Sequence, residues 1–207
     1  MTKNTSLNNW REAVSNLIQP GQGIVYMKVG VHAQESLEDI ISRKTKEIDE
    51  AGYALWGYGG NTCHPRSMVQ PFASSFEKQG RQIYLCMQEM NSRHFAEPVR
   101  ADQASPDGLK WEDIPAQINV LGSRFALVIK SLKRDEFDLS LDDTRVAVGR
   151  SAGNIGSKYI SGQVDKACLT ITDHVGTGDD EGKKLVRIGL VAELANPYAV
   201  FLRNRPQ

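Results

Sequence analysis

Ten consecutive residues near position 60 bring together several groups that bind or react with small molecules. The run WGYGGNTCHP, residues 56–65, contains three glycines, two aromatic rings, a thiol and an imidazole. Glycine lets the backbone adopt a positive φ and approach a ligand closely, and aromatic faces stack on planar groups. We therefore predict a ligand-binding pocket at this loop. The predicted binding residues are Trp56, Tyr58, Gly59, Gly60, Asn61, Thr62 and Arg66.

The chemistry of these side chains indicates the class of ligand. Backbone N–H groups of a glycine turn bind anions, and Arg66 supplies a forked positive charge for a phosphate or carboxylate. Tyr58 or Trp56 would stack on a base, and Asn61 would bond to its polar edge. His64 is the candidate catalytic acid or base, because imidazole exchanges protons near neutral pH. The loop thus predicts a nucleotide-like or phosphorylated small molecule, with hydrolysis as the simplest reaction.

Three other interpretations of the chain stay open. The loop also fits a tight structural turn with Trp56 in the core. A non-catalytic nucleic-acid reader would hold one unpaired base between Trp56 and Tyr58. A protein-interaction subunit of a larger complex would instead pack an N-terminal helix on its partner, through Trp10, Val14 and Leu17. Basic and acidic residues number 25 each, and the resulting net charge of zero disfavours binding to a nucleic-acid backbone.

The cysteines and histidines give no pattern for a metal centre. The three cysteines, Cys63, Cys86 and Cys168, are far apart, and no pair has the spacing of zinc ligands. As a nucleophile, Cys63 would need a base from a distant part of the chain, such as His32. We predict no metal, and no motif identifies a cofactor. Without a secretory leader or a long apolar run, we expect a cytoplasmic protein with no membrane association.

A second glycine-rich run, GRSAGNIGSK, occupies residues 149–158. Its lysine does not directly follow the last glycine, as a phosphate loop requires, and its glycine spacing differs from the dinucleotide-binding fingerprint. The run fits either an ordinary connection or a polar turn that closes Arg150 and Lys158 over an anionic ligand.

The glycine loop needs a scaffold, and hydrophobic periodicity predicts one. Residues 24–31 are rich in β-branched side chains and predict a strand. Residues 36–51 predict an amphipathic helix, with Ser36 as its N-cap and Gly52 as a left-handed C-cap. Its acidic and basic side chains alternate in a way typical of a solvated face. A strand over residues 53–56 then leads into the glycine loop.

The rest of the chain predicts mostly strands. One strand is expected at residues 81–87, where alternate side chains face opposite sides. Residues 91–122 contain three prolines and form either a candidate lid, with a helical turn at 111–114, or a surface excursion. Further strands are expected at residues 125–132, 137–141, 145–148, 167–172, 185–193 and 198–202.

Helices early in the chain and strands late in it predict the α+β class. We expect a single domain over residues 1–207, with an N-terminal helix and one well-formed amphipathic helix. The sheet is expected to be mixed or mainly antiparallel, and such a sheet can curl into a half-barrel.

Overall fold

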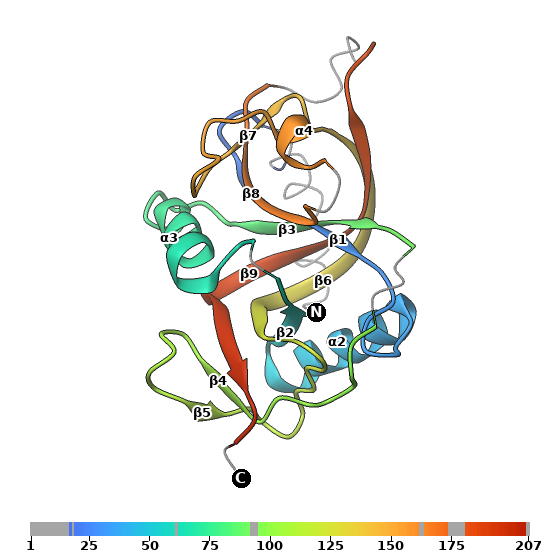
Figure 1. The fold of residues 1–207 in the computed structure, drawn as a ribbon, viewed down its shortest axis with the longest axis vertical. Helices are drawn as coiled ribbons and strands as arrows, with labels where there is room; N and C mark the ends of the chain where they lie inside the picture. The colour runs from blue at the N-terminus through green and yellow to red at the C-terminus, as the bar shows by residue number, and fades with distance from the viewer. Residues whose placement is uncertain are drawn as a thin grey trace, which may run out of the picture.

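The computed structural model describes residues 17, 19–60, 62–91, 95–161, 164–173 and 181–205 (Figure 1). Within these ranges the fold is α+β, with few helices and one large sheet, as predicted. The elements are, in chain order, β1 (Gly23–Val29), α2 (Leu37–Ala51), β2 (Ala54–Tyr58), η1 (Pro65–Val69), α3 (Gln70–Glu77), β3 (Tyr84–Glu89), β4 (Gln103–Ser105), β5 (Glu112–Asp113), β6 (Phe125–Ser140), β7 (Thr144–Val146), α4 (Gly156–Tyr159), β8 (Lys166–Ile171) and β9 (Leu185–Arg203).

The sheet of the described residues has nine strands and is not closed. Seven strands follow the order β2-β6-β9-β3-β1-β8-β7, and β4 and β5 join at the end of β9. The pair of β1 and β3 is parallel, whereas the other described pairs are antiparallel. The sheet is therefore mixed and mainly antiparallel, as expected. Figure 1 shows β6 and β9 as long curved strands that cross the molecule beside each other.

These two long strands replace four of the predicted ones. Residues 125–132 and 137–140 are both part of β6, which ends one residue before the predicted strand 137–141 does. Residues 185–193 and 198–202 are both part of β9. Their pairing shifts register at three places, the last between Arg134 and Phe137. A bulge adds an unpaired residue and bends the strand without ending it. The alternation of apolar and polar side chains is interrupted at these bulges, but each strand continues through them.

The predicted amphipathic helix is confirmed as α2. The Ser36 Oγ accepts a hydrogen bond of 3.1 Å from the backbone N–H of Asp39 at its start. Gly52 has a φ of 81° at its end, and its N–H donates to the carbonyl of Ile48. Glycine adopts this left-handed conformation without steric strain, because it has no Cβ. The capping residues Ser36 and Gly52 therefore predicted both ends of this helix correctly.

Two short strands between residues 103 and 113, β4 and β5, join the sheet. The helical turn predicted at 111–114 is wrong, because residues 112–113 form β5 and pair with β4. The Trp111 ring lies under the guanidinium of Arg203, 4.0 Å from its Cζ. Pairing with a neighbouring strand has prevailed over the local helical tendency of this segment.

The core lies on both faces of the sheet. Leu85 and Met87 of β3, with Ile83 just before the strand, contribute to a cluster that also contains side chains of α2 and α3. Tyr84 and Cys86 point into a second cluster, so the predicted alternation is confirmed. The predicted N-terminal helix lies outside the described residues, apart from Leu17, which is buried in the second cluster. The sequence did not predict α3, which buries Phe72 and Phe76.

Candidate ligand-binding site

A cavity of about 710 Å³ lies beside α2, where the ends of β1, β2 and β8 meet. α2 packs against β2 and β6 at this end of the sheet (Figure 1). Binding sites for small molecules commonly have volumes of about 300–1,000 Å³. The lining residues belong to residues 27–32, 35–44, 56–60, 120–123 and 164–166, together with Thr62 and Met90.

The structure divides the predicted glycine-loop site into two parts. One part lines the cavity and comprises Trp56, Tyr58, Gly59, Gly60 and Thr62. The other part, His64 and Arg66, is not among the lining residues. Asn61 lies outside the described residues. The division occurs at Cys63, whose φ of 56° turns the chain into η1.

Tyr58 anchors the loop to the wall of the cavity. Its side chain is buried, and its hydroxyl donates a hydrogen bond of 2.7 Å to the carbonyl oxygen of Cys63. Burial raises the pKa of Tyr58 well above its ordinary value, with smaller contributions from Cys63 and Cys168. The hydroxyl therefore stays protonated and continues to hold the left-handed residue Cys63.

His64 has a structural role outside the cavity. Its Nδ1 accepts a hydrogen bond of 3.4 Å from the N–H of Ser67 and so caps η1. Its ring packs edge-on against Phe125 and Phe201, with centroid distances of 5.8 and 5.3 Å. Arg66 donates to the carbonyl of Asp107 at 3.4 Å. Catalysis by His64 stays a prediction.

Lys166 supplies a buried positive charge to the cavity. Its side chain is only 5% exposed, and its Nζ lies 2.6 Å from Oδ1 of Asp165. The ammonium also lies 5.8 Å from the centre of the Tyr58 ring. An ammonium has three donors, and Asp165 is its one hydrogen-bond partner among the described residues. Donors of Lys166 are thus available to a ligand.

Lys166 was not a candidate in the sequence analysis. It stands at the first position of β8, directly before a strand that the sequence analysis began at residue 167. A lysine at a strand end normally reaches solvent. The adjacent Asp165 is the one sign in the sequence of an ion pair with Lys166. An adjacent carboxylate does not show whether such a pair is buried or exposed.

A buried ion pair on α2 brings a second lysine, Lys44, to the cavity wall. Lys44 and Glu47 are both about 2% exposed and form an ion pair with Nζ–Oε2 of 2.8 Å. Lys44 also donates to the carbonyl of Asn119 at 2.8 Å, and Glu47 accepts from the Asn119 N–H at 3.0 Å. The prediction of a solvated face is therefore wrong for these residues. The backbone carbonyl and N–H of Asn119 supply the remaining hydrogen bonds of the ion pair. These partners are distant in the sequence, so the periodicity of the helix could not predict them.

Burial shifts the titration of this lysine. Desolvation lowers the pKa of Lys44 to about 8, and the attraction of Glu47 offsets part of that effect. Arg43 joins the same group, with Nη1 3.1 Å from Oε1 of Glu47 and a further ion pair to Glu35. The hydrogen bonds of Lys44 and Glu47 attach α2 to Asn119. Val120, Leu121 and Ser123, which follow Asn119, line the cavity.

His32 and Ser123 form a polar pair on the cavity wall. The Nε2 of His32 lies 3.3 Å from Oγ of Ser123 and 3.2 Å from the carbonyl oxygen of Leu121. Ser123 Oγ donates to the same carbonyl at 2.9 Å. From the sequence, His32 is a candidate only as a base for Cys63. The pair joins residues 91 positions apart, so no local motif identifies it.

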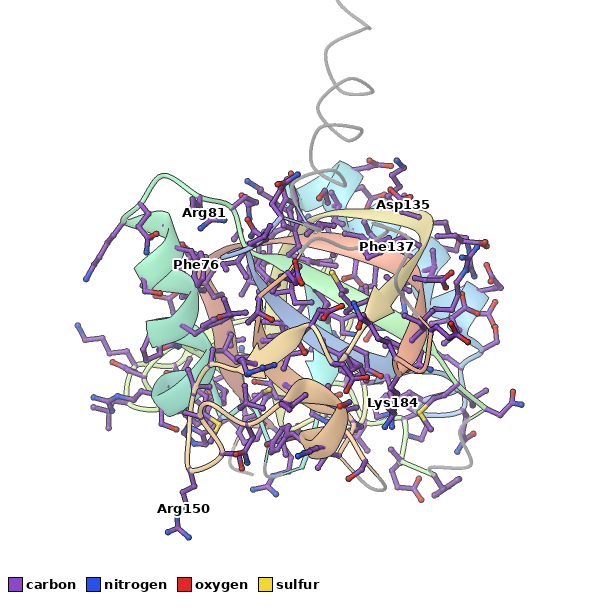
Figure 2. All side chains as sticks on the ribbon, turned by 90° about the horizontal axis from the view of Figure 1, so that it is seen from above. Phe76, Arg81, Asp135, Phe137, Arg150 and Lys184 are labelled. Atoms are coloured by element: carbon purple, nitrogen blue, oxygen red, sulfur yellow. The ribbon has the colours of Figure 1, made fainter. Side chains whose placement is uncertain are left out.

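The second glycine-rich run lies away from the cavity. None of its residues lines the cavity, and Figure 2 shows Arg150 extending outward from the ribbon. Gly156 starts α4, and an added Cβ there would lie 2.0 Å from Oγ1 of Thr144. Close packing of α4 on β7 therefore accounts for this glycine. Closure of Arg150 and Lys158 over a ligand stays a prediction.

The described residues contain no group of three or more His, Cys, Asp or Glu side chains that could hold a metal ion. In the same part of the chain, no helix has both the length and the apolar character needed to cross a membrane. Comparisons of the chain with protein-family models, with curated proteins and with solved structures found no match. The function is therefore inferred from the geometry of the site.

Gly57 provides a test of how the cavity wall is packed. An added Cβ at Gly57 would lie 2.2 Å from Oγ of Ser123, whereas nothing lies within 4 Å of the corresponding position at Gly59. We expect Gly57→Ala to lower the free energy of unfolding by about 1–3 kcal/mol, as overpacking does. The matched variant Gly59→Ala should change it by less than about 0.5 kcal/mol. Urea denaturation measures both, and equal values for the two variants would contradict the described packing.

Lys44 provides a test of the buried ion pair. The folded protein releases the Lys44 proton near pH 8, whereas the unfolded chain holds it until about pH 10.4. The unfolded state thus binds more protons in this interval, and the free energy of unfolding should rise with pH by an amount on the order of 2–3 kcal/mol.

Two glutamine variants isolate this effect from other alkaline titrations. The difference in unfolding free energy between wild type and Lys44→Gln should grow between pH 8 and 10.5. Lys46→Gln, at a 74% exposed side chain on the same helix, should show a constant difference. Parallel pH profiles of all three proteins would show that Lys44 is hydrated in solution.

Proposed function

We propose that this chain binds a small anion that carries a planar ring, with a nucleotide as the representative ligand. The observation that supports the proposal best is the buried ammonium of Lys166, which has one described hydrogen-bond partner and borders a cavity. Burying a charge is costly unless it is paired, so donors left over at a buried ammonium favour an anionic ligand. A phosphate or carboxylate oxygen would complete the hydrogen bonds of Lys166.

The composition of the cavity wall supports the same class of ligand. Four lining side chains are cationic, namely Lys28, Arg43, Lys44 and Lys166, and two are carboxylates, namely Glu35 and Asp165. Glu47 pairs with both Arg43 and Lys44, so three carboxylates face the four cations. The remaining positive charge favours anions over cations. Glu47 and the Asn119 carbonyl accept from Lys44, whereas the buried ammonium of Lys166 has Asp165 as its one described acceptor, so Lys166 is the lysine we assign to the ligand.

The remaining lining groups suit the rest of such a molecule. Trp56 and Tyr58 border the wall with side chains that belong to the core and are 4% and 2% exposed, as the structural interpretation of the loop expected for Trp56. A bound planar group would therefore contact only a small part of either ring. Gly59 and Gly60 carry no side chain, so a ligand can approach the backbone N–H groups there. Thr62 adds a hydroxyl that can orient the bound molecule.

The finer expectations from the sequence form part of this proposal. We infer a half-barrel curl of the sheet around the cavity and a reducing, cytoplasmic location that suits three free buried thiols. Hydrolysis with His64 as the acid or base is the reaction proposed from the sequence, although His64 does not line the cavity. The N-terminal helix stays the proposed surface for a protein partner.

Isothermal titration calorimetry with AMP, adenosine and inorganic phosphate tests the proposal. AMP should bind, and adenosine and phosphate should each bind more weakly, because each makes only part of the contacts. Lys166→Met should weaken AMP binding by about 10–100-fold, the value of a hydrogen bond to a charged group. Lys130→Met, at an exposed lysine of β6, is the matched control and should bind like the wild type.

Two results would contradict the proposal. Absence of binding by all three probes would exclude a nucleotide-like ligand, and equal affinities of wild type and Lys166→Met would exclude the role of Lys166. Binding of a short single-stranded oligonucleotide with a steep salt dependence, and no binding of AMP, would favour the nucleic-acid reader instead.

A further inference from the structure

We propose that Ser123 is a nucleophile and His32 its general base, and that together they cleave a phosphoryl group of the molecule bound in the cavity. The substrate class in this inference rests on the proposed anion binding, whereas the reactivity of Ser123 does not. Both side chains border the same cavity as Lys166, Trp56 and Tyr58. A nucleophile, a base and a cation around one space are the parts that phosphoryl transfer needs.

The contacts of His32 fit both protonation states of a general base. The Ser123 hydroxyl donates to the carbonyl of Leu121 at 2.9 Å. With the His32 proton on Nδ1, a rotation of this hydroxyl would redirect its hydrogen to Nε2, which lies 3.3 Å from Ser123 Oγ. After proton transfer, the new Nε2–H has an acceptor in place, the carbonyl oxygen of Leu121 at 3.2 Å. Catalytic hydrogen bonds are often long without substrate and shorten when it binds. The carbonyl of Leu121 thus stabilises the protonated imidazole.

The backbone around this pair is unusually constrained. Ala33 and Gln34 follow His32 with φ values of 48° and 66°, in a region that non-glycine residues rarely adopt. Gly122 precedes Ser123 with a φ of 54°, and an added Cβ there would lie 2.8 Å from the carbonyl oxygen of Glu97. Strained backbone concentrates at sites that need one fixed geometry.

Gly57 makes room for the hydroxyl of Ser123 from the opposite side. The position of its missing Cβ lies 2.2 Å from Ser123 Oγ, so any side chain at residue 57 would displace the hydroxyl. Gly57 lines the cavity together with Trp56, Tyr58, Gly59 and Gly60. The loop therefore holds the nucleophile close to the aromatic and cationic groups of the site.

The proposed reaction has two steps. In the first, Ser123 Oγ attacks phosphorus, its proton passes to His32 Nε2, and the bond from phosphorus to the leaving oxygen breaks. His32 returns the proton to that oxygen, and Lys166 balances the negative charge that develops on the phosphoryl group. In the second step, water attacks the phosphoserine with His32 again as base, and Ser123 regains its proton. One water molecule is consumed in each cycle.

The chain contains a second serine–histidine pair that serves as a control. Ser67 Oγ lies 3.1 Å from Nδ1 of His64, but this pair caps η1 and neither residue lines the cavity. Ser67 is exposed, and the same Nδ1 accepts the backbone N–H of residue 67. Proximity of a serine to an imidazole is common to both pairs, so only their surroundings distinguish them.

Labelling with a fluorophosphonate tests the inference without a known substrate. The reagent forms a bond between serine oxygen and phosphorus as fluoride leaves, and mass spectrometry of the intact protein and its peptides locates the adduct. We expect one adduct, on Ser123, and none in Ser123→Ala. His32→Gln should slow labelling by about 100-fold, as the loss of a general base does. Ser67→Ala should be labelled at the rate of the wild type.

Several outcomes would overturn the inference. These are no labelling of the wild type, labelling at Ser67 instead, or the same rate in His32→Gln. Peptide mapping of the wild-type adduct decides the site even if Ser123→Ala does not fold. If labelling at Ser123 occurs but AMP neither binds nor protects Ser123, the proposed ligand is wrong and the nucleophile is retained. If AMP binds and Ser123 is not labelled, the binding function stands and the nucleophile is excluded.

Discussion

The buried ion pair of Lys44 and Glu47 determines where one wall of the cavity lies. Moving two charges out of water is costly, and their attraction compensates only if the remaining hydrogen-bonding groups are also satisfied. Here the backbone carbonyl and N–H of Asn119 provide those partners at 2.8 and 3.0 Å. Loss of either contact would leave a buried charge incompletely paired. Asn119 is therefore held against α2. Ser123 follows four residues later, so its position at the cavity depends on this contact.

Two buried lysines border the cavity, and their hydrogen bonds distinguish their roles. The ammonium of Lys44 has acceptors for its donors in Glu47 and Asn119, so it holds structure. The ammonium of Lys166 has Asp165 alone among the described residues, although its side chain is nearly as buried. A buried ammonium donor without an acceptor costs free energy. An anion that enters the cavity would bring those acceptors to Lys166, and binding would relieve the cost of its burial.

Local features of the sequence predicted α2 and the first strands well, because Ser36, Gly52 and the apolar periodicity act within a few residues. The extents of β6 and β9 were beyond such reasoning, since bulges interrupt the alternation that signals a strand while pairing across the sheet continues. The same limit applies to the site. The cavity contacts of residues 56–60 follow from the end of β2, whereas those of Lys166 and Ser123 depend on strands that pair over long separations in the chain.

The turn at Cys63 explains why a polar run that is continuous in sequence does not form one site. Before the turn, residues 56–60 border the cavity, and after it His64 caps η1 and packs against two phenylalanines. Tyr58 maintains the turn through its hydrogen bond to the Cys63 carbonyl, and its raised pKa keeps that donor protonated. The imidazole beside the glycines is thereby directed to helix capping. The imidazole of His32 reaches the cavity instead, because β1 ends there and His32 Nε2 lies beside Ser123 Oγ, directly before the left-handed residues Ala33 and Gln34.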